Sequence, residues 1–313
     1  MKTFCLDLSR GCPKGFEALQ ALQENTAITV GNFDGVHLGH VQLIRRLVEE
    51  ASKRKLKSLV LSFHPHPLHV LSPAQAPCEL SNPSEKAKLM ETLGVDYLVF
   101  IKFDREFSKI RAVEFLEEIL FKKLGMRFLF VGYDWRFGYR REGEIELAKE
   151  VGEKLGFEVK SFEPYRIDGH IVSSTLVRRL LREGRLEEAK RFLGRDYWIE
   201  RKVVKGDGRG SKLGFPTANL SDTHNLCLKE GVYKVRINGE LLGVANYGLR
   251  PTFGGKRKVL EVHILNFSGN LVGKTLRVEF LSFIREERKF SSVDELKRQI
   301  EEDIRMATHE GSG

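Results

Sequence analysis

The sequence has no long apolar run. Its best uninterrupted apolar stretches, residues 97–101 and 128–131, are far shorter than the roughly 18 residues that a membrane-spanning helix needs. Residues 1–15 also lack the apolar segment of a secretory signal. We therefore expect a cytoplasmic protein that neither spans a membrane nor has a membrane partner.

Cysteine is scarce and irregularly spaced. The four cysteines are Cys5, Cys12, Cys78 and Cys227, and no two of them form a C-x-x-C pair. A zinc ribbon or a dithiol redox motif would need such a pair. We therefore expect reduced thiols, as is usual in the cytoplasm.

The positive charge is not concentrated in one region. The net charge is +9, with 20 basic and 15 acidic residues in 197–313 and 32 basic and 28 acidic residues before them. Nucleic-acid binders usually concentrate their charge on one face, so we expect no nucleic-acid partner. A mild positive field suits anionic small substrates such as ATP. The length of 313 residues predicts about two domains.

The first half of the chain alternates short apolar segments with helical patterns. The predicted strands are 28–30, 59–63, 97–101, 128–131 and 159–162, and the predicted helices include 41–51, 84–93, 113–124 and 145–155. A strand about every 30 residues is typical of βαβ units, and continuously apolar strands indicate a parallel sheet covered on both faces. We predict a Rossmann-like α/β domain over residues 1–185.

The pattern changes near Gly194. Alternating strands are predicted at 197–204, 232–237, 241–247, 259–267 and 275–283, and two short helices, 174–181 and 186–193, precede them. Asn238-Gly239 between two such segments is a strong hairpin signal. Dense hairpins predict a small antiparallel β-barrel over residues 186–313. A helix with an apolar face starting after Ser292 ends the chain.

The segment 31–40, GNFDGVHLGH, follows the first predicted strand and runs into a helix. The start of such a helix offers free N–H groups to phosphate. His37 and His40 would both face that point and could donate hydrogen bonds to the charge that develops at an α-phosphorus and its leaving group. We predict both as catalytic. The loop residues predicted to contact ATP are Gly31, Phe33, Asp34 and Gly35.

Further polar segments follow other predicted strands. Ser62-Phe63-His64-Pro65-His66-Pro67 should lie at the carboxyl edge of the sheet, where open α/β folds bind ligands. We predict a ligand contact for His66, and a zinc cluster is the alternative because five of the nine histidines fall between 37 and 69. The segment 131–138 combines Asp134, an arginine and aromatic rings, which suits a flat heteroaromatic ligand.

Residues 172–178 open a second helix with three hydroxyl groups and an arginine one turn later. Serine and threonine there are ordinary helix caps. The added arginine favours triphosphate binding, and we predict contacts from Ser174, Thr175 and Arg178.

The second half carries its own polar loop. Glycine-rich residues 206–214, with Arg209 and Lys212 as counter-charges, lead into Phe215-Pro216-Thr217-Ala218-Asn219. The Walker A spacing is absent, but the loop could wrap a polyphosphate, with Gly210 against it. Pro216 should fix an extended segment in which Thr217 and Asn219 point the same way. Their oxygens suit Mg²⁺ beside phosphate.

An acid lies on a predicted strand downstream. If Leu260 and Val262 face one side, Glu261 faces the other, where it could accept a proton from a substrate hydroxyl. The later charged run 283–290 is bracketed by phenylalanines. It leaves room for a flavin-facing loop that includes Arg285.

Together these segments resemble the bacterial bifunctional riboflavin kinase/FMN adenylyltransferase (FAD synthetase) family. The similarity extends from about Ile28 to Ala307. It rests on these segments of the chain: 31–40, 63–67, 131–138, 173–178, 214–219, 243–253, 261–265 and 283–290.

The resemblance implies two activities in one chain. An N-terminal domain would join AMP from ATP to FMN, and a C-terminal flavokinase barrel would phosphorylate riboflavin with ATP, giving FMN and then FAD. By position, His37 and His40 resemble the adenylyl-transfer histidines, and Ser174, Thr175 and Arg178 the triphosphate-binding helix start. Thr217 and Asn219 resemble the Mg–ATP pair, and Glu261 the base that activates the ribityl hydroxyl. Asp134 falls where the family has a polar residue that contacts the flavin or the nucleotide, and Arg285 falls in the flavin-side loop. On the resemblance we predict flavin contacts for His66, Asp134 and Arg285.

Two alternatives stay open at this point. One is a nucleotidyltransferase for another acceptor, such as phosphopantetheine or nicotinamide mononucleotide, against which the second module argues. The other is a basic nucleic-acid-binding protein or a flavin-sensing regulator, which no basic stripe supports. The sequence leaves monomer and homo-oligomer equally open.

Overall fold

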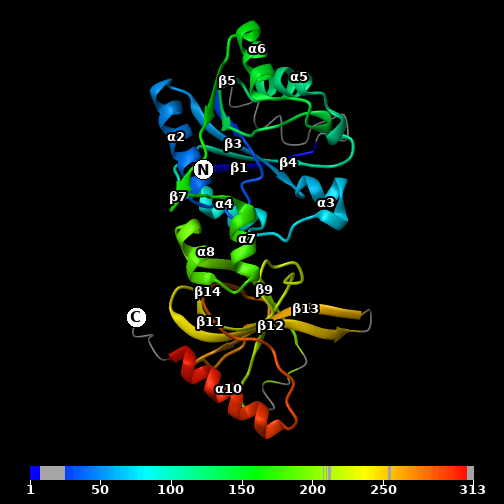
Figure 1. Cartoon of the computed structure of the whole chain (residues 1–313), viewed down its shortest axis with the longest axis vertical. Coiled ribbons are helices and arrows are strands. Elements are labelled where there is room, and N and C mark those ends of the chain that lie inside the picture. The colour runs from blue at the N-terminus through cyan, green and yellow to red at the C-terminus, as the bar shows by residue number, and fades with distance from the viewer. Residues whose placement is uncertain (8–24, 207, 209, 211–212, 253–254, 309–313) are drawn as a thin grey trace. The chain divides into compact units, whose positions relative to one another are not determined.

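The computed structural model describes residues 1–7, 25–206, 208, 210, 213–252 and 255–308 (Figure 1). The chain divides into two compact units, which we describe separately. The first contains residues 1–77 and 81–172, and the second contains residues 78–80 and 173–313.

A six-stranded sheet forms the centre of the first unit, with all its strands parallel. The strand order is β1-β4-β3-β2-β5-β6. Its strands are β1 (Lys2–Leu6), β2 (Thr26–Val30), β3 (Lys57–His64), β4 (Tyr97–Lys102), β5 (Met126–Gly132) and β6 (Glu158–Phe162). Without the edge strand β1, this is the doubly wound order of a Rossmann fold, and the order reverses between β2 and β5. Ligands of such folds bind at the carboxyl ends of the strands at that point.

Helices cover both faces of the sheet. One face packs against α2 (Leu38–Lys53) and α4 (Pro83–Glu91), and the other against α5 (Ala112–Glu114), the π-helix η3 (Phe115–Lys123) and α6 (Ile145–Leu155). Helix α2 is amphipathic because its apolar residues recur at helical spacing, and its buried residues are Leu43, Ile44, Leu47 and Ala51. The shorter elements are α3 (Pro67–Leu71), η1 (Pro73–Gln75), η2 (Phe107–Lys109), η4 (Tyr139–Arg141), β7 (Arg166–Ile167) and β8 (His170–Ile171).

The second unit is a closed antiparallel barrel in the order β10-β13-β12-β11-β14-β9. Its strands are β9 (Tyr197–Val204), β10 (Ala218–Leu220), β11 (Gly231–Ile237), β12 (Leu241–Thr252), β13 (Gly255–Ile264) and β14 (Thr275–Arg285). Helices α7 (Ser174–Arg182) and α8 (Leu186–Leu193) precede the barrel, and α10 (Val293–Thr308) follows it. The predicted fold class is confirmed.

Every strand of the barrel contributes inward-facing residues to the barrel core. Tyr233 and Tyr247 are fully buried in it. Burial raises the pKa of Tyr247 to about 12 and that of Tyr233 above its ordinary value, so both phenols stay neutral. The hairpin between β11 and β12 turns at Asn238 and Gly239, whose φ angles of 52° and 82° are those of the expected tight turn.

Most predicted elements are present, with some differences. Strand β1 and the three-residue strand β10 were not predicted, and the helix predicted over 113–124 is mainly a π-helix. The expectation of reduced thiols is wrong for one pair: Cys78 and Cys227 form a disulfide within the second unit. They are 149 residues apart in sequence, so only the folded chain brings them together.

Within the described ranges, no helix is long and apolar enough to cross a membrane.

Candidate active sites

The loop between β2 and α2 contains strained backbone. Phe33 and Val36 have φ angles of 46° and 39°, in the left-handed region, and Gly35 between them has a φ of 77°. Such a conformation is unfavourable for any residue with a Cβ and most unusual for β-branched Val36. Strained backbone of this kind persists only where its surroundings hold it in place.

Ser81, which lies just before the start of α4, holds this loop in place through hydrogen bonds. The buried carboxylate of Asp34 accepts hydrogen bonds from the Ser81 backbone N–H and hydroxyl at 2.9 and 3.2 Å. The Ser81 hydroxyl oxygen in turn accepts the N–H of Gly35 at 2.9 Å. Asp34 therefore anchors the loop from within, and its predicted contact with ATP stays a prediction.

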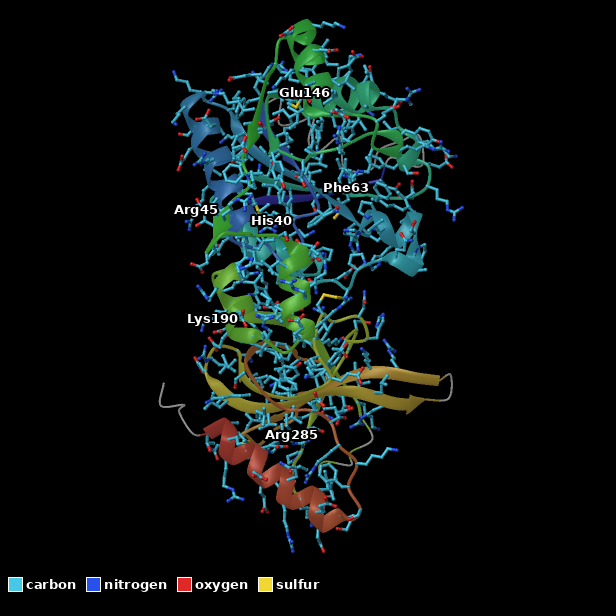
Figure 2. All side chains as sticks on the ribbon, viewed as in Figure 1. His40, Arg45, Phe63, Glu146, Lys190 and Arg285 are labelled. Atoms are coloured by element: carbon cyan, nitrogen blue, oxygen red, sulfur yellow. A yellow bond between two sulfur atoms is a disulfide. The ribbon has the colours of Figure 1, made fainter. Side chains whose placement is uncertain are left out.

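The loop delivers His37 and His40 to the start of α2, where Figure 2 labels His40. Their rings stack at 3.6 Å between centroids, and Phe33 meets His40 edge-on at 5.1 Å. Nδ1 of His37 accepts the backbone N–H of His40 at 3.3 Å, so in the neutral ring the proton lies on Nε2. His37 therefore caps the helix with one nitrogen and can donate a hydrogen bond with the other.

The loop that follows β5 lies at the same edge of the sheet. Because β5 pairs with β2 in parallel, the segment after Gly132 begins beside the loop that carries the histidines. Asp134 is exposed in this segment, and the rings of Trp135 and Phe137 stack at 4.1 Å between centroids. The order reversal therefore places the starts of both loops at the same edge of the sheet.

The segment 62–67 at the end of β3 contacts the loop after β2 through His66. Nδ1 of His66 caps α3 by accepting the Leu68 N–H at 3.2 Å, so Nε2 carries the proton. The Asn32 amide lies 3.1 Å from that nitrogen, measured from Nδ2, and its buried Oδ1 has no partner among the described residues. A half-turn of the amide satisfies both groups, so the network favours the Asn32 oxygen accepting from His66.

The described residues of this region do not form the zinc cluster that was the alternative prediction. Over the described ranges, no three His, Cys, Asp or Glu side chains are grouped as a metal site requires. A ring nitrogen of His69 lies 3.0 Å from the carbonyl of Pro77.

In the second unit, helix α7 begins as the hydroxyl pattern predicts. Ser173 is the N-cap and accepts the N–H of Leu176 at 3.2 Å, which places Ser174 and Thr175 in the first turn. Arg178 lies one turn later, and its Nε donates to the carbonyl of Cys78 at 2.9 Å.

The barrel brings two predicted residues together by strand register. Asn219 on β10 pairs directly with Glu261 on β13, whose other neighbour is Asn246 on β12. Leu260 and Val262 are fully buried, which confirms that Glu261 faces the opposite side. The Glu261 carboxylate forms an ion pair with Arg250.

Two glycines of the segment 206–214 lie close to Asn219 and Thr217. A Cβ at Gly206 would collide with the amide of Asn219, and one at Gly210 would collide with the carbonyl of Phe215 and lie 3.1 Å from the hydroxyl of Thr217. Glycine is therefore required for the loop to approach Thr217 and Asn219. The predicted counter-charges Arg209 and Lys212 lie outside the described residues.

Arg285, at the end of β14, contacts the last helix (Figure 2). Its Nε and an NH2 group donate to the two carboxylate oxygens of buried Asp303 on α10 at 2.8 and 2.7 Å. This bidentate pair orients α10 and the loop before it, and a direct flavin contact of Arg285 stays a prediction.

Four structurally important residues were not singled out from the sequence: Ser81, Lys86, Asn246 and Arg250. Ser81 and Lys86 act on a loop about 50 positions earlier, and no local pattern signals that contact. The segment of β12 that carries Asn246 and Arg250 does belong to the quoted family motif 243–253, but the strand pairing with Glu261 is needed to give them a role.

Two family models match successive parts of the chain. A FAD synthetase family model matches residues 19–176, and a riboflavin kinase family model matches residues 193–310. The bifunctional riboflavin kinase/FMN adenylyltransferase of Escherichia coli K12 is 41% identical over 288 residues, covering 91% of this chain and 92% of that protein. The protein of the same name from Buchnera aphidicola (Schizaphis graminum) is 37% identical, with 94% and 96% covered.

A solved structure is similar over nearly the whole chain. The crystal structure of a Streptococcus pneumoniae protein named as a macrolide-efflux protein matches with a TM-score of 0.79 and 29% identity, covering 92% of this chain and 95% of that one. The identities and coverage of the curated relatives confirm the resemblance inferred from the motifs. The chain belongs to the bifunctional riboflavin kinase/FMN adenylyltransferase family and combines a FAD synthetase domain with a riboflavin kinase domain.

Proposed function

We propose that the chain makes FAD in two steps at two sites, with FMN adenylylation assigned to residues 1–185 and riboflavin phosphorylation to residues 186–313. Two observations support this. The stacked histidines lie at the order reversal of a parallel sheet, and a carboxylate and an amide face each other across adjacent barrel strands. The matching family models support the two activities.

In the adenylylation step, a phosphate oxygen of FMN attacks the α-phosphorus of ATP and pyrophosphate leaves. Negative charge accumulates on the oxygens around that phosphorus and on the leaving group. His37 and His40 lie at the helix start. In this proposal the Nε2–H of His37 and the imidazole of His40 donate hydrogen bonds to this charge. No covalent enzyme intermediate is required, so positioning and electrostatics supply the catalysis.

Several segments of the chain would hold the two substrates. Gly31, Phe33 and Gly35 border the phosphates, and Ser174, Thr175 and Arg178 at the start of α7 bind the triphosphate. Asp134 and His66 contact the flavin from the loops after β5 and β3. The exposed position of Asp134 and the fixed tautomer of His66 are compatible with these roles.

In the kinase step, Glu261 accepts the proton of the riboflavin 5′-hydroxyl as that oxygen attacks the γ-phosphorus of ATP, and ADP leaves. Arg250 holds the carboxylate, and the register with Asn219 keeps it beside the nucleotide side of the barrel. The absence of a side chain at Gly210 allows its close approach to Thr217, beside which the phosphates would bind.

Magnesium fits the residues near that loop. The Thr217 hydroxyl and the Asn219 amide oxygen are hard ligands, and both side chains lie against the close-approaching glycines. Mg²⁺ bound there with ATP would neutralise charge on the transferred phosphoryl group.

The direct test is incubation of the purified chain with riboflavin, ATP and Mg²⁺, followed by chromatography. We expect FMN to appear first and FAD to follow, with added EDTA stopping the formation of both. FMN as the sole product would contradict the adenylylation assignment, and the absence of any flavin product would contradict the kinase assignment.

A further inference from the structure

Lys86 on α4 is a buried lysine outside the predicted sites. Only 6% of it is exposed to solvent. Its ammonium group donates to the backbone carbonyl of Asn32 at 2.5 Å and to the hydroxyl of Ser62 at 3.1 Å, and it lies 5.6 Å from the centre of the Phe100 ring. The lysine therefore reaches from the helix to the loop that follows β2.

Burial of an ammonium group is costly unless hydrogen bonds compensate for lost hydration. A methionine would fill the same space without that cost, so packing alone does not account for a lysine here. Ser62 is also fully buried, and its hydroxyl donates to the same Asn32 carbonyl at 3.1 Å. Two buried donors thus converge on one backbone oxygen.

That oxygen lies at a critical point of the loop. Asn32 directly precedes Phe33, the first of the residues with positive φ, and the strained turn leads to His37. The side chain of Asn32 also contacts His66, so fixing its backbone orients both segments at the edge of the sheet. Ser81 anchors the far side of the turn through Asp34 and Gly35. Lys86 and Ser62 anchor the near side.

We propose that Lys86 is a positioning residue for adenylyl transfer. It holds the Asn32 carbonyl, and with it the strained loop, in the geometry that places the His37 and His40 imidazoles for the reaction. The inference rests on the proposed role of these histidines. It predicts that removing the ammonium group slows the chemical step more than it weakens ATP binding, because a small displacement of catalytic groups is enough to reduce the rate about 100-fold.

The test compares Lys86→Met with Lys88→Met, an exposed lysine on the same helix. For Lys86→Met we expect kcat of FMN adenylylation to fall roughly 10- to 100-fold, while KM for ATP changes less than about threefold. Riboflavin kinase activity of the same molecules and all parameters of Lys88→Met should stay unchanged. An unchanged adenylylation kcat overturns the proposal. So does a parallel loss of both activities, which indicates a general structural role.

Ser62→Ala covers the case in which Lys86→Met does not fold. This variant removes the second donor to the same carbonyl and should lower the adenylylation kcat roughly 3- to 10-fold, and no effect would contradict the proposal. If both variants fold, their effects should be non-additive in the double mutant, because both act through Asn32. His40→Ala, assayed in parallel, separates the two hypotheses. If His40→Ala still adenylylates FMN, the proposed histidine site is rejected. If His40→Ala loses adenylylation while Lys86→Met keeps full activity, only the role of Lys86 is rejected.

Discussion

The two units place their functional side chains in different ways. In the α/β unit, the candidate residues lie on loops and helix starts beyond the strands, where hydrogen bonds from Ser81 and Lys86 hold the backbone. In the barrel, Asn219 and Glu261 lie on neighbouring strands, and the register of the ladder sets their distance. A loop site therefore depends on anchors distant in sequence, whereas a strand site depends on the pairing that builds the barrel.

This difference predicts how the two activities respond to change. A substitution in one set of functional side chains should abolish one reaction and leave the other as an internal control. A substitution of backbone or covalent support should instead act through the stability of one unit. The following predictions test the contrast from the largest expected effect to the smallest.

Glu261→Gln should have the largest effect. The amide cannot accept the hydroxyl proton, so the rate of riboflavin phosphorylation should fall roughly 100- to 10,000-fold. FAD formation from added FMN should persist. The matched control is Glu240→Gln, at an exposed position in the β11–β12 turn, which should leave both rates unchanged. Both rates can be followed by chromatography of the flavins. A Glu261→Gln variant with full kinase activity would exclude Glu261 as the base.

His40→Ala should give the reverse result. Loss of a hydrogen-bond donor to developing charge typically lowers kcat about 100- to 1,000-fold, so we expect that loss in FMN adenylylation. Phosphorylation of riboflavin should continue, and FMN should accumulate in place of FAD. If the variant adenylylates FMN at the original rate, the histidines have no part in the mechanism.

Many helices and strands of both units could be predicted from the sequence because the patterns that indicate them are local. Strand β9 and helix α8 have the predicted bounds, since alternation and helical periodicity extend over whole elements. Strand β10 has only three residues, too few for a periodic pattern, and it becomes a strand because β9 and β13 flank it. The π-helical geometry of 115–123 likewise has no periodic signature distinct from that of an α-helix.

The candidate sites, too, could be predicted from the sequence only where their residues are close together in the chain. The glycines and histidines of the 31–40 loop are adjacent in sequence, so their chemistry could be inferred. The hydrogen bonds from Ser81 to Asp34 and from Lys86 to Asn32 bridge 47 and 54 positions, and no local rule predicts them. The ion pair of Glu261 with Arg250 depends on the pairing of β12 with β13.

The disulfide offers a test of covalent support. Cys78 and Cys227 both belong to the second unit, so Cys227→Ser should destabilise that unit. A loss of about 2 to 4 kcal/mol is typical and corresponds to a decrease in Tm of roughly 5 to 15 °C. Kinase activity should be lost on heating at a lower temperature than in the unchanged chain. Cys5→Ser, which removes an exposed free thiol, is the control and should have no effect. Equal thermal inactivation of both variants would show that the bond contributes no stability.

The smallest effects should come from two glycines with the same backbone conformation, one in each unit. Gly156 ends α6 and Gly239 turns the β11–β12 hairpin; both have φ of 82°, and at both a methyl group would enter open space, with no neighbouring atom within 4 Å. Alanine at either position should cost about 1 kcal/mol from backbone strain alone, because no contact is lost or created. Heating followed by separate assays should show earlier loss of adenylylation in Gly156→Ala and earlier loss of kinase activity in Gly239→Ala. If each substitution instead lowered both inactivation temperatures equally, the two units would unfold together. The difference between the α/β unit and the barrel would then concern how they position their functional side chains, and not their stability.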